Sequence, residues 1–443
     1  MSGHNQPQPA FVVTHRMVLG LALPMTFGFL TIPLLGITDT AVAGRLGDAA
    51  ALAGLAIGAV LFDLIFTTFN FLRASTTALV AQAWGRGDHD EQEAVFWRAL
   101  LTAIVLGIAI VVLSPLILKL GLLLMAPEPA AAEATSHWLS VRILSGPAAL
   151  ANYAVLGYLL GRGKAKTGLA IQALINGINI LCCILFGLWM KGGIGGIALA
   201  TVTGETIGML VGLVIVLRGF ATRNPFHRPD LLDRSKLKAL FALNSDIMIR
   251  TFVLLGAFMV MTRIGNAYGP VVLAANAVLM NFFMVAGFWL DGLANAAETI
   301  IGRAIGAGHK PAFDRGVWLT GVWSLVLAGL TSLFFLVFGA PIIDFLTTVP
   351  EVRLMAYEHL PLAAATAVCG FLAFHMDGVF IGATWSHAMR NRMLLAFLGY
   401  LLALALLVPW LGNQGLWLSL NVFLILRGVL LAAGLPRLRD QIF

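Results

Sequence analysis

The chain is organised as a series of long apolar segments separated by short polar connections. A helix needs about twenty apolar residues to cross the hydrocarbon core of a membrane. Only 11% of the 443 residues are charged, against about 25% in a typical soluble domain. The sequence therefore predicts an all-α integral membrane protein with twelve transmembrane helices. The twelve segments cover residues 16–44, 51–84, 94–124, 135–161, 168–190, 194–218, 237–265, 271–306, 315–340, 353–384, 391–411 and 414–435.

Positive charges are unevenly distributed between the two sets of connections. Nineteen of the 28 lysines and arginines fall in the termini and the even-numbered connections or at the segment ends beside them, and five fall in or beside the odd-numbered ones. Cytoplasmic loops of membrane proteins are enriched in lysine and arginine. We therefore expect both termini in the cytoplasm. The remaining four, Arg73, Arg142, Arg250 and Arg427, lie well inside the apolar segments, away from their ends.

The second half of the chain repeats the first at an offset of 221 residues. Gly157 and Gly161 fall on Gly378 and Gly382 at that offset, and a duplicated six-helix unit explains it. Transporters built from parallel repeats bind their substrates between the repeats. The predicted organisation is a cytoplasmic N-terminal tail (1–15), an N-terminal six-helix lobe (16–218), a cytoplasmic linker (219–236), a C-terminal six-helix lobe (237–435) and a cytoplasmic tail (436–443). The GxxxG at 157–161 is expected to mark a helix contact inside the protein.

Asp39 is the most informative polar residue of the first half. It stands near the end of the first segment, after Pro24 and Pro33, which can kink a helix. A charge at mid-membrane costs roughly 2.5–3.5 kcal/mol on insertion scales, so a carboxylate there is paired, protonated or exposed to water. The alternative places Asp39 at the membrane interface. Asn179 and Thr201 add polar groups in the fifth and sixth segments, where such residues often only bond neighbouring helices.

The second half carries a polar stripe on its second helix. Asp291, Asn295 and Glu298 fall at i, i+4 and i+7 on one face of the eighth segment. The repeat places Asn70 on Asp291 and Thr77 on Glu298, so the same face is polar in both copies. Because two lipid-facing polar stripes would be costly, we expect both faces to point to the interior.

Arg250 in the seventh segment has several candidate partners. Asp246 stands four residues before it and can form a local pair. Across helices, Arg250 can equally neutralise Asp291 or Glu298. Asp377 in the tenth segment completes this second-lobe cluster, for which a structural ion pair is the alternative to a functional role. A carboxylic acid in a low-dielectric surrounding has a raised pKa, so protonation in such a cluster can bias a two-state arrangement of helices.

Several motifs stand out along these segments. They include LALPM (21–25), PLLGITDTAVAGRLG (33–47), LDGLANAAETIIGRAIGAG (290–308) and MDGVFIGATWSHAMRN (376–391). Together these motifs resemble those of the multidrug and toxic compound extrusion (MATE) transporters, in particular their DNA damage-inducible protein F branch. The resemblance covers roughly residues 15–435, and its motifs are specific only in combination. It implies two six-helix lobes with a central cavity, in a bacterial cytoplasmic (inner) membrane.

The resemblance also implies roles for individual residues. Asp39 is similar to the first-helix carboxylate that binds the coupling proton, and Asn179 and Thr201 to its hydrogen-bonding neighbours. Pro24 resembles the bending proline, and Asp377 the tenth-helix carboxylate of the second lobe. Several relatives carry an aspartate four residues after the position of Asn179, where this chain has Cys183. That difference favours a single-proton site at Asp39 over a pair of carboxylates.

The function expected from these observations is secondary active export of small amphipathic, often cationic organic compounds, coupled to inward proton movement. The alternatives are coupling to sodium and a lipid-linked precursor flippase of related architecture. The sequence contains no HExxH or GxSxG motif, so we expect no enzyme, and we expect neither a cofactor nor a bound metal. Its aromatic residues are not interleaved with lysine and arginine, which argues against nucleic acid. The expected partners are the substrate and the lipid bilayer, and the chain is expected to be a monomer.

Overall fold

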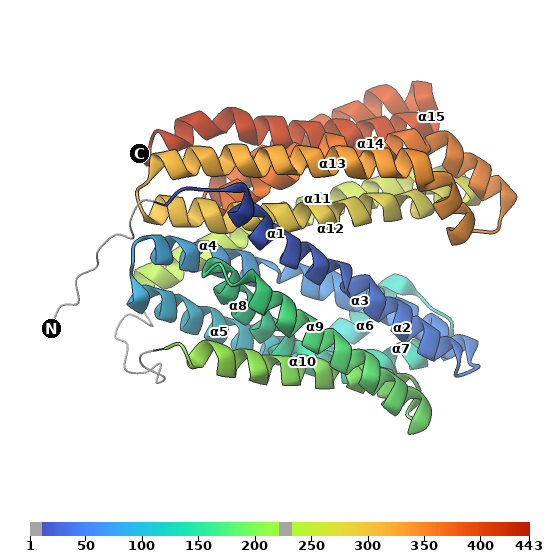
Figure 1. Cartoon of the computed structure of the whole chain (residues 1–443). Helices are drawn as coiled ribbons and strands as arrows, with labels where there is room; N and C mark the ends of the chain where they lie inside the picture. The colour runs from blue at the N-terminus through green and yellow to red at the C-terminus, as the bar shows by residue number, and fades with distance from the viewer. Residues whose placement is uncertain (1–10, 221–232) are drawn as a thin grey trace. The chain divides into compact units, whose positions relative to one another are not determined.

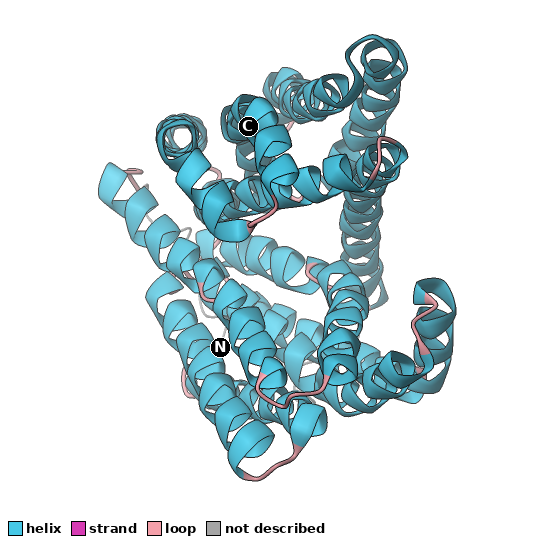
Figure 2. Ribbon diagram, turned by 90° about the vertical axis from the view of Figure 1, so that its right-hand side faces the viewer, coloured by secondary structure: helices cyan, strands magenta, loops and turns pink. Residues whose placement is uncertain are grey.

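The computed structural model describes residues 11–220 and 233–443, and these residues form helices joined by short loops, with no strand among them (Figures 1 and 2). Most of the predicted tail 1–15 and linker 219–236 lies outside the described residues. The helices are α1 (His15–Leu30), α2 (Ile32–Gly44), α3 (Ala49–Thr68), α4 (Phe71–Gly85), α5 (His89–Val112), α6 (Ser114–Met125), α7 (Pro129–Arg142), the 3₁₀ turn η1 (Ile143–Ser145), α8 (Gly146–Gly161), α9 (Ala165–Cys182), the π-helical η2 (Cys183–Trp189), α10 (Gly193–Leu217), α11 (Arg234–Ala267), α12 (Pro270–Gly306), α13 (Lys310–Leu346), α14 (Pro350–Gly382) and α15 (Ser386–Arg439).

The number of spans agrees with the prediction. Eleven helical stretches among the described residues are long and apolar enough to cross a membrane, and the last of them, Ser386–Arg439, is 54 residues long. The backbone of α15 leaves the helical region at Gly412, with φ 56° and ψ −130°. This break falls between the two predicted spans 391–411 and 414–435, so α15 contains both. The prediction of a twelve-helix all-α membrane protein is confirmed.

Spans in the first half are interrupted, whereas those in the second half are mostly continuous. The first span breaks at Thr31 between α1 and α2, and the fourth breaks at η1 between α7 and α8. The fifth ends in the π-helical turn η2. By contrast, α12 and α13 each run for 37 residues without a break. Interruptions of this kind free backbone groups and are frequent at functional sites.

The described residues form two compact units. Within the first unit, α5 packs on α8, α9 on α10, and α3 on α7. Within the second, α14 packs on α12, α13 and α15. The domain boundaries expected from the sequence stay a prediction. The first unit contains residues 27–84, 88–220 and 233–241, and the second contains residues 11–26, 85–87 and 242–443.

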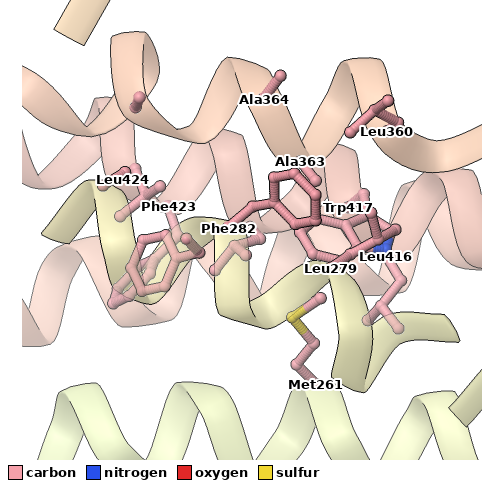
Figure 3. Close-up of a cluster of buried hydrophobic side chains, with 14 of the residues drawn as sticks. Met261, Leu279, Phe282, Leu360, Ala363, Ala364, Leu416, Trp417, Phe423 and Leu424 are labelled. Atoms are coloured by element: carbon pink, nitrogen blue, oxygen red, sulfur yellow. The ribbon is translucent and has the colours of Figure 1, made fainter. Parts of the chain in front are cut away.

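A large apolar cluster fills the second unit (Figure 3). Trp417 is fully buried in it, with Leu279 and Phe282 of α12 close by. The indole Nε1 of Trp417 donates a hydrogen bond to the side-chain oxygen of Asn276 at 2.8 Å. Asn276 and Asn413 also exchange two amide hydrogen bonds, at 2.8 and 3.0 Å. Because buried polar groups are costly unless paired, this satisfied network fixes α12 to α15 beside the break at Gly412.

The duplicated glycines make the same contact in both units. A Cβ atom at Gly157 of α8 would lie 2.7 Å from the carbonyl oxygen of Arg73 in α4. At the equivalent position in α14, a Cβ at Gly378 would lie 2.2 Å from the carbonyl oxygen of Ala294 in α12. Only glycine allows the two backbones of each pair to approach so closely. The GxxxG at 157–161 therefore marks an internal helix contact, as predicted.

The backbone between these helices repeats as well. Gly87 and Gly308, which are equivalent by the repeat, have φ of 73° and 62°. Gly163 and its equivalent Thr384 have φ of 68° and 58°. Left-handed residues at matching positions end the same helices in both halves. The internal duplication predicted from the sequence is thus visible in both loop conformation and helix packing.

Candidate functional site

The first membrane span is broken close to its centre. The hydroxyl of Thr31 donates to the carbonyl oxygen of Gly28 at 2.6 Å, and the chain resumes as α2 with Pro33 in its first turn. The side-chain amide of Asn176 in α9 donates to the same Thr31 hydroxyl. Pro24 is buried within α1. The break is thus held by a polar side chain from another helix, and the role of Pro24 in bending stays a prediction.

Asp39 lies on α2, half-buried, eight residues after the break. Its carboxylate accepts a hydrogen bond from the thiol of Cys183, with a sulfur–oxygen distance of 3.3 Å. Cys183 is fully buried and begins the π-helical turn η2. The residue that departs from the family pattern is therefore the one that contacts Asp39 directly.

Asn179 and Thr201 lie close to this position but are not bonded to Asp39. Both side chains are buried, on α9 and α10. The two helices approach closely at Gly204, where a Cβ atom would lie 3.3 Å from the Cβ of Asn179. Among the described residues, the amide atoms of Asn179 have no hydrogen-bond partner. The structure brings Cys183, rather than Asn179 or Thr201, into contact with the carboxylate.

Sequence reasoning gave no role to Arg142, which the structure places in the interior of the first unit. Arg142 ends α7, is 9% exposed and interacts electrostatically with Glu205, Asp39 and Asp63. Glu205 in turn accepts a hydrogen bond from the side chain of Asn152 at 2.6 Å. A charged residue within an apolar segment was the available signal, but spacing along the chain could not show which carboxylates surround it.

In the second unit, one carboxylate is held by two arginines. Asp377 on α14 accepts hydrogen bonds from Arg250 on α11 and from Arg427 on α15, the latter at 2.7 Å. The side chains of Arg427 and Asp377 are only 2% and 8% exposed. A guanidinium–carboxylate pair is among the strong hydrogen-bonded contacts in proteins. The predicted second-lobe cluster thus exists, with Arg427 as a member that sequence reasoning missed.

The prediction of a local pair between Asp246 and Arg250 is wrong. Asp246 instead accepts from Arg390 at 2.6 Å and from the hydroxyl of Ser386 at 2.9 Å, both on α15. Arg250 turns to Asp377, and not to a neighbour on its own helix. Spacing of four residues allows a contact along one helix, but each of these two residues has its charged partner on another helix.

The polar stripe of α12 lies largely inside the second unit. Asn295 and Glu298 are buried, and Asp291 is half-buried and interacts electrostatically with Arg427. Asn295 donates to the backbone carbonyl of Asp291 at 2.6 Å, a bond within its own helix. In the first half, Thr77 is buried but Asn70 is exposed. The prediction of an interior face is therefore confirmed for α12 and for Thr77, and it stays a prediction for Asn70.

Comparisons with known proteins agree with this architecture. A sequence model of the MatE family matches the chain twice, at residues 24–185 and 247–408, once in each half. DNA damage-inducible protein F of Escherichia coli is 38% identical over 93% of this chain and 90% of its own length. A probable multidrug resistance protein NorM of Deinococcus radiodurans is 28% identical over 96% of each chain.

A solved structure has the same fold. It is an outward-facing conformation of a multidrug resistance MATE family transporter, with a TM-score of 0.86 and 17% sequence identity over 97% of this chain and 96% of that one. The two family matches cover most of both halves, which agrees with the duplication seen in the helix contacts. The chain therefore belongs to the MatE family of multidrug and toxic compound extrusion (MATE) membrane transporters, in the branch of DNA damage-inducible protein F.

Proposed function

We propose that this protein is a secondary active exporter of small amphipathic, often cationic organic compounds, driven by inward movement of protons through Asp39. The substrate class is supported by relatives named multidrug resistance proteins. We also propose that the protein works as a monomer in a bacterial cytoplasmic membrane, with both termini in the cytoplasm, as the distribution of lysine and arginine indicates.

The thiol–carboxylate contact between Cys183 and Asp39 is the observation that carries proton coupling. A thiol donates a hydrogen bond to an ionised carboxylate but brings no second negative charge. Hard metal cations in proteins are surrounded by several oxygen ligands, whereas sulfur suits softer metals. A proton needs only one oxygen atom. The immediate surroundings of Asp39 therefore favour a proton over sodium.

The second-lobe carboxylate is poorly suited to carry the coupling ion. Asp377 already accepts from both Arg250 and Arg427. Binding a coupling ion there would compete with this contact and leave two guanidiniums without their shared partner, which is costly. We therefore propose that the second-lobe cluster of Arg250, Asp291, Asn295, Glu298 and Asp377 shapes and stabilises that lobe. Asp39, by contrast, forms no ion pair in the part of the chain that the structure describes, and it accepts a hydrogen bond from the neutral thiol of Cys183.

The test is transport of a fluorescent cationic dye by the full-length protein in proteoliposomes, under an imposed pH gradient or an imposed sodium gradient. Asp39→Asn keeps the shape of the side chain but cannot take up a proton. We expect it to lower pH-driven dye transport at least about tenfold, as the loss of a residue essential to coupling would. The matched control is Asp48→Asn, since Asp48 caps α3 and asparagine caps helices equally well.

Each other outcome contradicts a different part of the proposal. Full pH-driven transport by Asp39→Asn would move the coupling site elsewhere. Wild-type transport driven by sodium alone would replace the proton as the coupling ion. If the wild type moved no dye under either gradient, the substrate class would be wrong and a lipid-linked precursor flippase would be the next candidate.

A further inference from the structure

The break in the first span is the end of a chain of side-chain hydrogen bonds that comes from α9. The side-chain nitrogen of Gln172 donates to the side-chain oxygen of Asn176 at 3.1 Å. Asn176 in turn donates to the hydroxyl of Thr31, and that hydroxyl donates to the carbonyl oxygen of Gly28 at 2.6 Å. Every bond of this chain is donated toward the break, so the amide of Gln172 holds the backbone turn through two other side chains.

A second group of hydrogen bonds joins α8 to α10 in the same unit. The side-chain amide of Asn152 donates to the carboxylate of Glu205 at 2.6 Å and to the backbone oxygen of the same residue at 3.0 Å. The side-chain oxygen of Asn152 is buried and has no hydrogen-bond partner within residues 11–220 and 233–443. A buried carbonyl oxygen in this situation is costly, so a further donor belongs beside it.

A small cavity connects the two groups. Its volume is about 10 Å³, and both Asn152 and Gln172 line it. Its other walls are apolar and come from α8 and α9. A cavity of about this volume holds one water molecule when at least two polar groups are available to bind it. The cavity therefore has the size and the lining of a water site, and it is too small for an organic substrate.

A water molecule in this cavity can join the two groups into one chain. Water has two hydrogens to donate, and each of the two amide side chains has a carbonyl oxygen that accepts. One hydrogen can go to Asn152, which lacks a donor, and the other to Gln172. The chain then runs from Glu205 on α10 to Thr31 at the break. Because amide groups do not release protons at neutral pH, such a chain transmits orientation and not protons.

We propose that the cavity between α8 and α9 binds one structural water molecule, and that Glu205 is a positioning residue for the first span. The carboxylate fixes the amide of Asn152, and the water carries this orientation to the amides that hold Thr31. Asp39 lies on α2, eight residues after the break. The chain therefore sets where α2 presents the Asp39 carboxylate, and this role rests on the proposed proton coupling through that residue.

The experiment cuts the chain at both ends and measures dye transport by the full-length protein in proteoliposomes under a pH gradient. Glu205→Leu removes the first acceptor and Asn176→Leu the last amide. We expect each to lower the transport rate about threefold to tenfold, as the loss of one buried hydrogen bond does. The double variant should be no slower than the slower single variant, because a chain that is already cut transmits nothing. Glu205→Gln keeps an acceptor and should recover most of the rate.

The matched control is an amide outside the chain. Asn421 in the second unit donates to the backbone oxygens of Leu362 and Trp417. Residues without shared partners give effects that combine independently. The effects of Asn421→Leu and Asn176→Leu on the transport rate should therefore multiply, in contrast to those of the two cuts within the chain.

Two further measurements test the water itself. A high-resolution density map of the wild type should show one water molecule within hydrogen-bond distance of Asn152 and Gln172. Val155 is buried and lines the cavity, so Val155→Ile fills the cavity without changing a polar group. We expect this variant to slow transport and to add nothing to the effect of Asn176→Leu. Val155→Ala enlarges the cavity instead and should leave the chain intact.

The outcomes separate this proposal from the proposed function. Effects of Glu205→Leu and Asn176→Leu that multiply, or wild-type rates in both folded variants, would overturn the chain while proton coupling stands. A map without water in the cavity would overturn the water site. Sodium-driven transport by the wild type would contradict the proposed function, and the two cuts would still fail to multiply. If Glu205→Leu does not fold, Asn152→Leu cuts the chain at the next residue and takes its place in the same comparison.

Discussion

The two halves of this transporter descend from one repeated unit but hold their interior carboxylates in opposite ways. In the second unit, Asp377 is clamped by Arg250 and Arg427 between helices that run without interruption through most of their length. In the first unit, Asp39 is bonded by a thiol, and the nearby Arg142 pairs with no carboxylate among the described residues. The spans around it are broken at Thr31 and at η1.

This difference indicates a division of labour between the halves. A carboxylate that accepts hydrogen bonds from two guanidiniums on two other helices is held firmly in place. A carboxylate with one weak donor, on a short helix beside a broken span, can change its charge and its position at lower cost. The second unit therefore has the features of a rigid frame, and under the proposed proton coupling the first unit is the part that responds to the ion.

The largest effect is expected when the contact of Asp377 with Arg250 and Arg427 in the second unit is broken. Asp377→Asn leaves two guanidiniums without their shared carboxylate, and removing one partner of a buried pair costs about 3–5 kcal/mol. We expect a clear fall in the midpoint of thermal unfolding in detergent. Asp39→Asn should lower this midpoint far less, because it removes only one weak thiol contact. Equal losses in the two variants would show that the two carboxylates are not held differently.

The next prediction concerns the close helix contact that Gly157 makes in the first unit and Gly378 makes in the second. Gly378→Ala places a Cβ 2.2 Å from the backbone oxygen of Ala294, and Gly157→Ala places one 2.7 Å from that of Arg73. Overpacking of this kind typically costs about 1–3 kcal/mol, and neither backbone can move aside freely. We expect both variants to unfold at lower temperature, with the larger fall in Gly378→Ala. A wild-type midpoint in either would contradict the shared contact.

A smaller effect concerns the thiol that bonds Asp39. Cys183→Ala removes the donor, whereas Cys183→Ser keeps one. A donor favours the ionised carboxylate, so without it the proton binds more tightly, and half-maximal dye transport should move to higher pH. One hydrogen bond contributes about 0.5–1.5 kcal/mol, which limits the shift to roughly one pH unit. The same shift in both variants would mean that the thiol acts only through its volume.

Much of this arrangement could be predicted from the sequence, because membrane spans and repeats leave regular patterns. The lengths of the apolar segments predict twelve spans, and the constant offset of 221 residues makes Gly157 equivalent to Gly378. The partners of charged side chains could not be predicted in the same way. Spacing offers Arg250 as one partner of Asp246, but Arg390 bonds Asp246 from a helix far along the chain. Spacing describes one helix, whereas ion pairs are decided by how several helices meet.

The same limit explains why Arg142 and Arg427 were found only in the structure. Both are arginines inside apolar segments, so the sequence indicates that each needs a compensating group. It does not indicate that Arg427 meets Asp377 directly, or that Arg142 lies over the ring of Phe62 and bonds Ser145. Nor does it show that Cys183, and not Asn179, bonds Asp39. These contacts depend on the rotation of each helix about its axis, which polar stripes define only loosely.

The smallest expected effect comes from a surface counterpart of the Asp377 clamp. Asp440 follows α15 and accepts from Arg439 at 3.0 Å and from Lys310 at 3.1 Å, so it too has two basic partners. The hydrogen bond from Arg439, followed by that from Lys310, holds the pKa of Asp440 below its ordinary value.

A lowered pKa adds stability above the pKa of the unfolded chain, and this contribution is lost as the pH falls through the lower folded value. Water and salt screen Asp440 because it is exposed. We therefore expect Asp440→Asn to unfold at the wild-type temperature at pH 7, measured alongside Asp377→Asn. If Asp440→Asn were as destabilising as Asp377→Asn, the number of basic partners, and not their burial, would decide how firmly a carboxylate holds this fold together.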